Sequence, residues 1–373
     1  SAASDVYKRQ LRGTERFEIL SVIDAANEGK DAGTVLNGNP LGIPVYSSIA
    51  QFFKNSSESP EFCIVGVAFP GGILPEDCRK ELLAAMDHGL SIISGLHHYL
   101  NEDPEFQSSS INNKVKLIDI RKPRPVSELH FWTGKILEVP VPIIAILGSD
   151  CAVGKRTTAR FIMEVCRSRG IKTEMIYTGQ TGWMQGYSHG FIFDATPNDF
   201  VSGEIERVLL ECVDQSKPDL ILLEGQSSLR NPSGPCGSEF LLSGNAKGAV
   251  LVHPPGRKYF VDMEELGLQI PEIEDEIELI QKYGSKVIGV GLNEEGCDMG
   301  QLRSVQRTIS KKMNIPGVLP LTDGVNEIVD RIQTFLDQCI ISSFRNIYCP
   351  DLFSNLLLLV ADMVRVGSSW NFS

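Results

Sequence analysis

The chain has 373 residues, of which 42% are hydrophobic and 22% are charged, and its formal net charge is −12. This length exceeds what one hydrophobic core usually serves, so we expect two domains in an ordinary globular protein. The acidic balance argues against a nucleic-acid partner, because phosphate backbones are held by a surplus of Lys and Arg. It is compatible with a phosphorylated small molecule, which needs only a local cradle of backbone amides.

The cysteines and the apolar runs bear on where the protein works. The chain has nine cysteines and no C-x-x-C pair, which favours free thiols in a reducing compartment. No apolar run approaches the ~18 residues of a membrane-spanning helix. We therefore expect a soluble cytoplasmic protein with no membrane partner; whether it forms a homo-oligomer is left open. Residues 1–10 resemble translated sequencing adapter, so we expect residues 1–16 to be artefact or truncated N-terminus.

Strand-like and helix-like stretches alternate in the first half of the chain. Residues 76–88 have helical spacing, and short apolar runs predict strands at residues 17–23, 62–68, 90–94 and 115–120. This alternation predicts βαβ units around a parallel sheet, in a doubly wound α/β domain over residues 17–135. Prolines at 123, 125, 140 and 142 indicate a linker over residues 121–142.

The alternating pattern restarts at residue 143. Strands are predicted at residues 143–147, 173–177, 220–223, 249–252 and 286–290. Helices are predicted at residues 157–168, 200–213, 272–282, 299–313 and 325–336. These elements indicate a second doubly wound α/β domain over residues 141–338. The sequence assigns no role to the tail at residues 339–373.

The strongest motif follows the strand at residues 143–147. A glycine-framed loop leads from that strand into an amphipathic helix, which is the context of a P-loop. Glycines let the backbone approach a ligand, and successive amides with the helix N-terminus form a concave anion site. We predict a cofactor-binding segment that comprises Gly148, Ser149, Asp150, Cys151, Ala152, Val153, Gly154, Lys155, Arg156, Thr157 and Thr158.

The loop departs twice from the form G-x-x-x-x-G-K-[ST]. It has one residue more between Gly148 and Lys155, and Arg156 stands where the magnesium-binding Ser or Thr belongs. That hydroxyl must therefore come from Thr157 or be absent. The spacing, with Asp150 in the loop, resembles dethiobiotin synthetase and its relatives. We expect Lys155→Ala to abolish ligand binding and leave the fold intact, because an exposed loop lysine packs little.

Further candidates follow other predicted strands, where a parallel sheet gathers functional groups at its carboxyl edge. Glu224 is a candidate catalytic residue, and with Thr157 a candidate metal ligand. His253 is a candidate acid or base, and Arg257 a candidate clamp for phosphate or carboxylate. Asn293 is placed to read the amide edge of a base.

Two segments supply candidate substrate-binding residues. Gln180 and Thr181 belong to the stretch TGQTG, which is either a mobile switch loop or an ordinary polar turn. Gln226 follows the strand that ends at Glu224.

Taken together, these segments resemble one family of two-domain P-loop proteins, long known as a domain of unknown function and now associated with D-glutamate N-acetyltransferase. The resemblance runs from about residue 17 to residue 338. It rests on VIDAANEGKDAG at 22–33, AFPGG at 68–72, SGLHHYL at 94–100, IDIRKP at 118–123, GSDCAVGKRTT at 148–158, TGQTGWM at 178–184, LLEGQSSL at 222–229, HPPGR at 253–257 and GVGLN at 289–293.

This resemblance implies a Rossmann-like N-terminal domain, a P-loop NTPase-like C-terminal domain, and transfer of an acetyl group from acetyl-CoA to the amino group of D-glutamate. Coenzyme A carries a pyrophosphate and a 3′-phosphate, so a P-loop can serve it without hydrolysis. Such a transfer needs a base and oxyanion donors, for which Glu224, His253 and the loop amides are candidates. A dicarboxylate substrate needs cations, which Arg257 and Lys155 can supply.

The chain also departs from the family over residues 227–236. Ser227 stands where the family usually has Gly, and residues 231–236 read NPSGPC in place of a His-Pro-x-Tyr-Ser-Gly stretch. Two alternatives therefore stay open. One is a ligase or kinase that uses ATP with Mg²⁺ on a small carboxylate, favoured by the loop spacing and opposed by Arg156. The other is a nucleotide-binding protein whose substrate loop has decayed.

Overall fold

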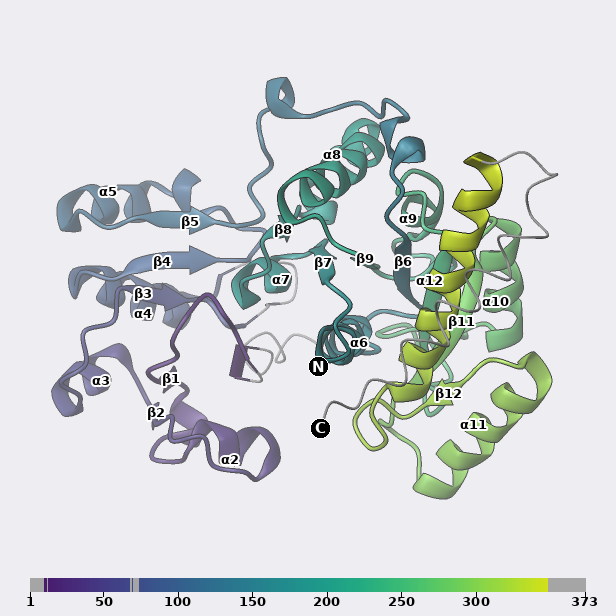
Figure 1. The fold of residues 1–373 in the computed structure, drawn as a ribbon. Helices are drawn as coiled ribbons and strands as arrows, with labels where there is room; N and C mark the ends of the chain where they lie inside the picture. Colours follow the sequence, from purple (N-terminus) through teal and green to yellow (C-terminus); the bar gives the residue numbers. More distant parts are fainter. Residues whose placement is uncertain (1–9, 12, 68, 70–73, 348–373) are drawn as a thin grey trace, which may run out of the picture.

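The computed structural model of the chain describes residues 10–11, 13–67, 69 and 74–347, with side chains up to residue 339. Two α/β domains lie next to each other, each built on a parallel sheet (Figure 1). The fold class predicted from the sequence is therefore confirmed. The AFPGG stretch, apart from Phe69, and most of the tail after residue 339 lie outside the described residues.

The N-terminal domain is organised around a three-stranded parallel sheet in the order β3-β4-β5. Its strands are β3 (Phe62–Ile64), β4 (Ser91–Ser94) and β5 (Leu117–Asp119), each inside a predicted apolar run. The predicted helix is α4 (Glu76–Asp87), and α5 (Pro104–Asn113) packs beside it. Side chains of α4 and β4 share one core, whose fully buried members include Ala85, Met86 and Ile92.

The predicted strand at residues 17–23 is wrong for most of its length. Only β1 (Val22–Ile23) is a strand, and it pairs with β2 (Val45–Tyr46) rather than with the three-stranded sheet. The partner strand has no room to extend, because Pro44 precedes it and Ser48 caps α3 (Ile49–Asn55) directly after it. Only two residues of the apolar run therefore have strand partners, and only these two form a strand.

The P-loop domain contains a seven-stranded parallel sheet in the order β12-β11-β10-β6-β9-β7-β8. Five strands match the predicted ones, and the two short edge strands were not predicted. The bounds are β6 (Ile143–Gly148), β7 (Thr173–Tyr177), β8 (His189–Gly190), β9 (Leu220–Glu224), β10 (Gly248–His253), β11 (Lys286–Leu292) and β12 (Gly317–Val318). The chain order reverses around β6, which places the end of β6 between the ends of β9 and β10.

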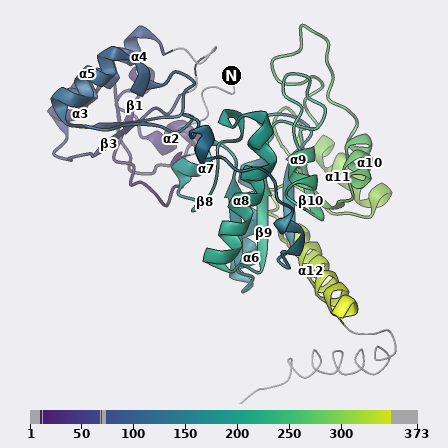
Figure 2. The ribbon, with the colours of Figure 1, turned by 90° about the horizontal axis from the view of Figure 1, so that it is seen from above.

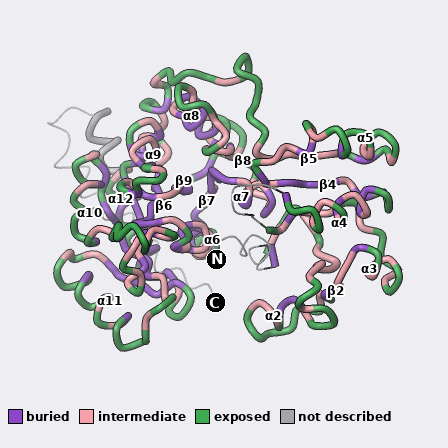
Figure 3. The backbone as a smooth tube through the Cα atoms, turned by 180° about the vertical axis from the view of Figure 1, so that it is seen from behind, coloured by how far each residue is buried: buried purple, intermediate pink, exposed green. Residues whose placement is uncertain are grey.

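Helices cover both faces of this sheet, so its central strands are buried throughout (Figure 3). Ile144 and Ile146 of β6 pack with α6 and α12, whereas Ala145 and Leu147 pack with α8, α10 and α11. The helix bounds are α6 (Lys155–Ser168), α7 (Gln180–Gln185), α8 (Asn198–Ser216), α9 (Ser238–Leu242), α10 (Ile273–Lys282), α11 (Met299–Met313) and α12 (Asn326–Ile347).

The last helix, α12, continues well past the predicted end at residue 336, and its C-terminal turns extend away from the sheet (Figure 2). Within the described part of the chain, no helix is long and apolar enough to cross a membrane.

The stretch TGQTG is not an ordinary polar turn, because α7 begins inside it at Gln180. A Cβ atom on Gly182 would collide with Tyr177 at the end of β7. Because glycine has no Cβ atom, this short helix can pack directly on the strand that precedes it. The helix ends at Gly186, whose φ of 98° is the left-handed conformation of a helix C-cap.

The segment that connects the two domains, residues 121–142, is docked on α8. Two buried glutamates of α8 hold it. Glu206 accepts hydrogen bonds from the backbone of Thr133 (2.6 Å) and Ile136 (3.1 Å), and Glu204 accepts one from the His130 backbone (3.2 Å). Trp132 Nε1 of this segment also donates a hydrogen bond of 3.1 Å to the Ser243 carbonyl, at the end of α9. The predicted linker is thus an ordered connection that fixes the N-terminal domain to the P-loop domain.

A substitution at Gly203 of α8 tests whether residues 121–142 pack on this helix. Alanine normally stabilises a helix interior by about 1 kcal/mol relative to glycine. Here a Cβ atom would collide with the His130 carbonyl oxygen, so we expect Gly203→Ala to lower the free energy of unfolding, by about 1–3 kcal/mol. Urea unfolding measures the change, and Gln215→Ala, at an exposed position of the same helix, is the control. A stabilised Gly203→Ala variant would contradict the docking.

Candidate functional site

The loop after β6 takes the backbone conformation of an anion-binding turn. Ala152 and Gly154 have φ angles of 53° and 97°, and Gly154 is the N-cap of α6. A Cβ atom on Gly148 would lie 2.8 Å from Val153 Cγ2 and 3.0 Å from Lys155 Nζ. Glycine at 148 therefore makes room for the lysine side chain to pass beneath the loop.

Lys155 is buried, contrary to the expectation of an exposed loop lysine. Its ammonium donates hydrogen bonds of 2.8 Å to the Asp150 carbonyl and 2.8 Å to the Ser227 carbonyl. Burial lowers the pKa of Lys155 from its usual value. The side chain thus connects the phosphate loop to the segment that follows β9.

Asp150 is fully buried and acts as an anchor for the loop. Its Oδ1 accepts hydrogen bonds from the Cys151 amide (2.7 Å) and from Asn231 Nδ2 (3.0 Å). Its Oδ2 accepts hydrogen bonds from Arg257 Nη1 (2.8 Å) and from the Val261 amide (2.9 Å). All four interactions are made inside the protein, so this carboxylate shapes the loop.

The divergent stretch at residues 227–236 also supports the loop. Asn231 is fully buried, and beyond its bond to Asp150 its Oδ1 accepts hydrogen bonds from the backbone and hydroxyl of Ser233 (3.0 and 2.8 Å). Ser227 has a φ of 40°, in the left-handed region that favours glycine. The position at which the resembled family usually has Gly is therefore one whose backbone suits Gly.

Glu224, at the end of β9, is buried and engaged on both oxygens. Its Oε1 lies 2.6 Å from Arg156 Nη2, and its Oε2 accepts a hydrogen bond of 3.2 Å from the Thr178 amide. Thr178 in turn accepts a hydrogen bond of 2.9 Å from Gln226. Among the described residues, no three His, Cys, Asp or Glu side chains gather as a metal site.

A cavity of about 520 Å³ lies over the phosphate loop and is shared by the two domains. Its charged lining consists of three cations and one carboxylate: Lys155, Arg156, Arg160 and Glu224. Its apolar lining consists of Leu11, Leu36, Leu41, Val153, Phe161 and Leu321, together with Cys151 and Ala152 of the loop. A local excess of positive charge in a chain of net charge −12 favours a ligand that carries anionic groups together with apolar surface.

Several predicted site residues meet in this cavity. They are Cys151, Ala152, Val153, Gly154, Lys155, Arg156, Thr157, Glu224 and Gln226. Gly148, Ser149, Asp150 and Thr158 belong to the loop or the start of α6 but do not line the cavity. Thr181 is buried in α7, and Gln180 lies against Gly95 of the N-terminal domain.

Three other predicted residues pack behind the loop. Arg257 pairs with Asp150, and Asn293 donates a hydrogen bond of 3.0 Å to the Val153 carbonyl. His253 Nδ1 lies 2.9 Å from the Ser149 hydroxyl. Burial lowers the pKa of His253 to about 4, so its imidazole is neutral at pH 7. These side chains are placed to hold the loop in shape.

Some cavity residues were missed by the sequence reasoning. Arg160 is four residues from Arg156 on α6, and this helical spacing could have revealed it. Leu36 and Leu41 carry no such signal, because the packing of the two domains alone brings them over the loop. Leu11 belongs to residues 1–16, which the sequence predicts to be artefact or truncated N-terminus. In that segment the Glu15 amide donates a hydrogen bond of 2.9 Å to the Gln185 carbonyl of α7.

Comparisons with known proteins agree with this architecture. Residues 130–329 match a family described as "Domain of unknown function (DUF1611_C) P-loop domain", and residues 25–123 match "Domain of unknown function (DUF1611_N) Rossmann-like domain". A protein of Pseudoalteromonas sp named D-glutamate N-acetyltransferase is 29% identical over 273 residues, 71% of this chain and 79% of that protein.

A second curated relative and a solved structure extend the comparison. A Tritonibacter scottomollicae protein, also named D-glutamate N-acetyltransferase, is 28% identical over 279 residues, 72% of this chain and 80% of that protein. The crystal structure of a DUF1611 family protein from Anabaena variabilis superposes with a TM-score of 0.80 at 24% identity. The match covers 89% of this chain and 95% of that chain, and the two proteins share the same two-domain fold.

Proposed function

This chain belongs to the DUF1611 family, and we propose that it is an N-acetyltransferase that moves the acetyl group of acetyl-CoA to the amino group of a small amino acid such as D-glutamate. The names of its two curated relatives support this reaction. The observation that carries the proposal is the cavity, whose cationic floor lies at the phosphate loop and whose apolar side is formed with the N-terminal domain.

Coenzyme A fits the character of this lining. Its phosphates suit the loop amides, Lys155 and Arg156, since charged donors make the strongest phosphate contacts. Its long pantetheine arm suits a wall that includes Leu36, Leu41 and Phe161. The lining thus offers both kinds of contact that this ligand needs.

The transfer requires an amine that has lost its proton. Its nitrogen attacks the thioester carbonyl, the C–S bond breaks, and coenzyme A leaves as the thiolate, which takes up the proton that the nitrogen loses as the amide forms. Of the two acid–base groups predicted from the sequence, Glu224 lines the cavity and His253 does not. We therefore propose the Glu224 carboxylate as the group that accepts the proton of the substrate ammonium.

Calorimetry and thermal shift with acetyl-CoA and with ATP–Mg²⁺ test this function first. Acetyl-CoA binding followed by acetylation of D-glutamate, detected by mass spectrometry, is the expected result. A response to ATP–Mg²⁺ alone would instead favour the ligase or kinase. Binding of acetyl-CoA without acetylation of any amino acid offered would point to a nucleotide-binding protein with a decayed substrate loop.

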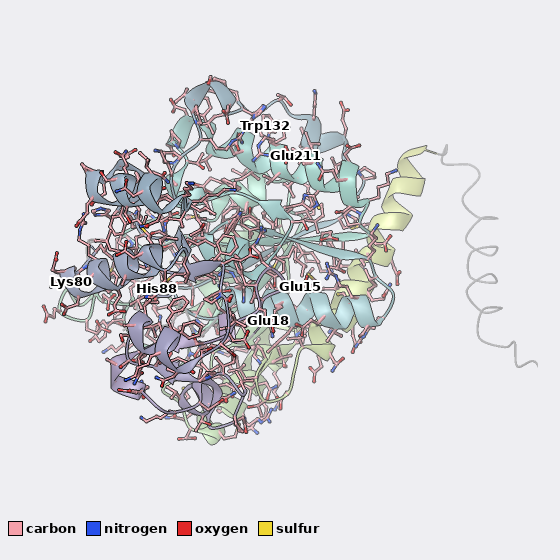
Figure 4. All side chains as sticks on the ribbon, turned by 90° about the vertical axis from the view of Figure 1, so that its left-hand side faces the viewer. Glu15, Glu18, Lys80, His88, Trp132 and Glu211 are labelled. Carbon is pink, nitrogen blue, oxygen red and sulfur yellow. The ribbon has the colours of Figure 1, made fainter. Side chains whose placement is uncertain are left out.

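Glu224→Gln tests the proposed base. The amide keeps the size of the side chain but cannot take up a proton, so we expect kcat to fall by about 10²–10⁴-fold. Acetyl-CoA binding should persist, because the loop and Lys155 are unchanged. Stopped assays give kcat, and calorimetry gives the affinity. Glu211→Gln, on the surface of α8 (Figure 4), is the control. Wild-type turnover in Glu224→Gln would remove this carboxylate from the mechanism.

A further inference from the structure

Arg156 occupies the position at which P-loops carry the hydroxyl that binds magnesium. It is the second residue of α6 and lines the cavity beside Lys155. Its side chain is only 12% exposed. The Arg156 guanidinium therefore stands where the usual P-loop has the hydroxyl that binds the magnesium ion.

The surroundings hold this guanidinium in the cavity wall. Its Nη2 atom lies 2.6 Å from Glu224 Oε1. A Cβ atom on Gly179 would lie 3.4 Å from the same Nη2. Because glycine has no side chain, the guanidinium can occupy this space. Glu224 is itself anchored by the Thr178 amide. The position of Arg156 is thus determined by the ends of both β7 and β9.

Two donors of this guanidinium lack partners among the residues that the structure describes. Nε and Nη1 of Arg156 are buried, and neither has an acceptor among the described residues. An unpaired buried donor costs about 1–3 kcal/mol and is rare in native proteins unless a ligand completes it. This side chain lines the cavity over the phosphate loop, so an anionic ligand bound there is the candidate acceptor for these donors.

The magnesium ion that a P-loop fold implies does not fit these residues. The hydroxyl next to the lysine is replaced by Arg156, and Thr157 lies one residue further, about 100° around the helix. Glu224 already pairs with the Arg156 guanidinium, so a metal ion at this carboxylate would have to displace that cation. A divalent cation beside the guanidinium would also be repelled by its charge. The predicted metal ligands Thr157 and Glu224 therefore do not assemble a magnesium site.

We propose that Arg156 takes the place of the metal, so that this P-loop binds the diphosphate of its ligand without a divalent cation. The identity of that ligand as coenzyme A rests on the proposed function, whereas the metal independence rests on Arg156 itself. A guanidinium offers a planar pair of donors that matches two phosphate oxygens. Acetyl transfer breaks no phosphate bond, so the site has no leaving phosphate for a metal to stabilise.

Calorimetry with inorganic pyrophosphate and with coenzyme A, each in excess EDTA and in excess Mg²⁺, tests the proposal. We expect equal affinity for coenzyme A in the two buffers. Arg156→Thr, which restores the usual hydroxyl, should lose about 10–100-fold in affinity for both probes in EDTA. Arg156→Lys keeps the charge and should recover part of that loss. Arg167→Thr, at the far end of the same helix, is the matched control.

The outcomes separate this proposal from the proposed function. Acetylation that needs Mg²⁺, or coenzyme A binding that vanishes in EDTA, would overturn the role of Arg156 and leave the acetyltransferase standing. Pyrophosphate binding in EDTA that Arg156→Thr removes would sustain the role of Arg156 even if no acetylation occurred. A thermal melt of Arg156→Thr close to that of the wild type shows that the change lies in the site. Unchanged affinity in a folded Arg156→Thr variant would refute the proposal.

Discussion

Lys155→Ala is expected to reduce acetyl-CoA affinity by about 100-fold. A hydrogen bond from a charged donor contributes about 1.5–3 kcal/mol, and each 1.4 kcal/mol is tenfold in affinity. The substitution also leaves the carbonyls of Asp150 and Ser227 without their donor. We therefore expect the free energy of unfolding to fall by about 1–3 kcal/mol, rather than to stay unchanged.

Two variants separate the loss of binding from the loss of stability. Lys155→Met keeps most of the buried side chain but not the ammonium, so it should lose binding to the same extent and unfold with a smaller penalty. Lys282→Ala removes an exposed lysine from α10 and should change neither quantity. Calorimetry and urea unfolding measure the two effects. An affinity within threefold of wild type in both Lys155 variants would exclude this loop as the phosphate site.

Asp150→Ala is expected to lower the free energy of unfolding by about 3–5 kcal/mol, because it leaves the Arg257 guanidinium without its buried partner. Donors from Asn231, Cys151 and Val261 lose their acceptor at the same time. The loop should then lose its shape, and coenzyme A binding should be lost with it. Unfolding in urea, without ligand, isolates the structural effect.

A double-mutant cycle shows how much of this cost belongs to the pair. If Asp150 and Arg257 act together, the double variant should be less destabilised than the sum of the single variants. Asp214→Ala, an exposed aspartate of α8, is the control for the loss of a carboxylate. Additive effects would mean that Asp150 and Arg257 do not act as a pair, and an Asp150→Ala protein as stable as wild type would mean that Asp150 does not anchor the loop.

These two predictions depend on features that the sequence predicted only in part. The strand, the glycine-framed loop and the helix around Lys155 could be read from local patterns, because apolar runs and glycine spacing act over neighbouring residues. The burial of Lys155 could not, because its partner carbonyl at Ser227 lies 72 residues away along the chain. The same holds for Asp150, whose partners Asn231 and Arg257 come from segments after β9 and β10.

The roles of individual candidates changed for the same reason. Arg257 and Asn293 follow strands as predicted, yet both donate hydrogen bonds to backbone carbonyls of the loop, and neither lines the cavity. The divergent residues 227–236 left a decayed substrate loop open as one alternative, and Asn231 among them supports Asp150. A polar side chain at a strand end can face a ligand or a neighbouring loop, and sequence periodicity does not distinguish the two.

The sequence by itself determined the two parallel α/β sheets, the phosphate loop from Gly148 to Lys155, and the unusual Arg156 beside that lysine. Each of these follows from residues close together in the chain, where hydrophobic periodicity and glycine placement control the backbone. Only the tertiary structure decided that Arg156 pairs with Glu224 and that two of its donors have no acceptor among the described residues. It also decided that Leu36 and Leu41 line the cavity over the loop. Those contacts join residues distant in sequence, because they arise from the packing of strand ends and of one domain against the other.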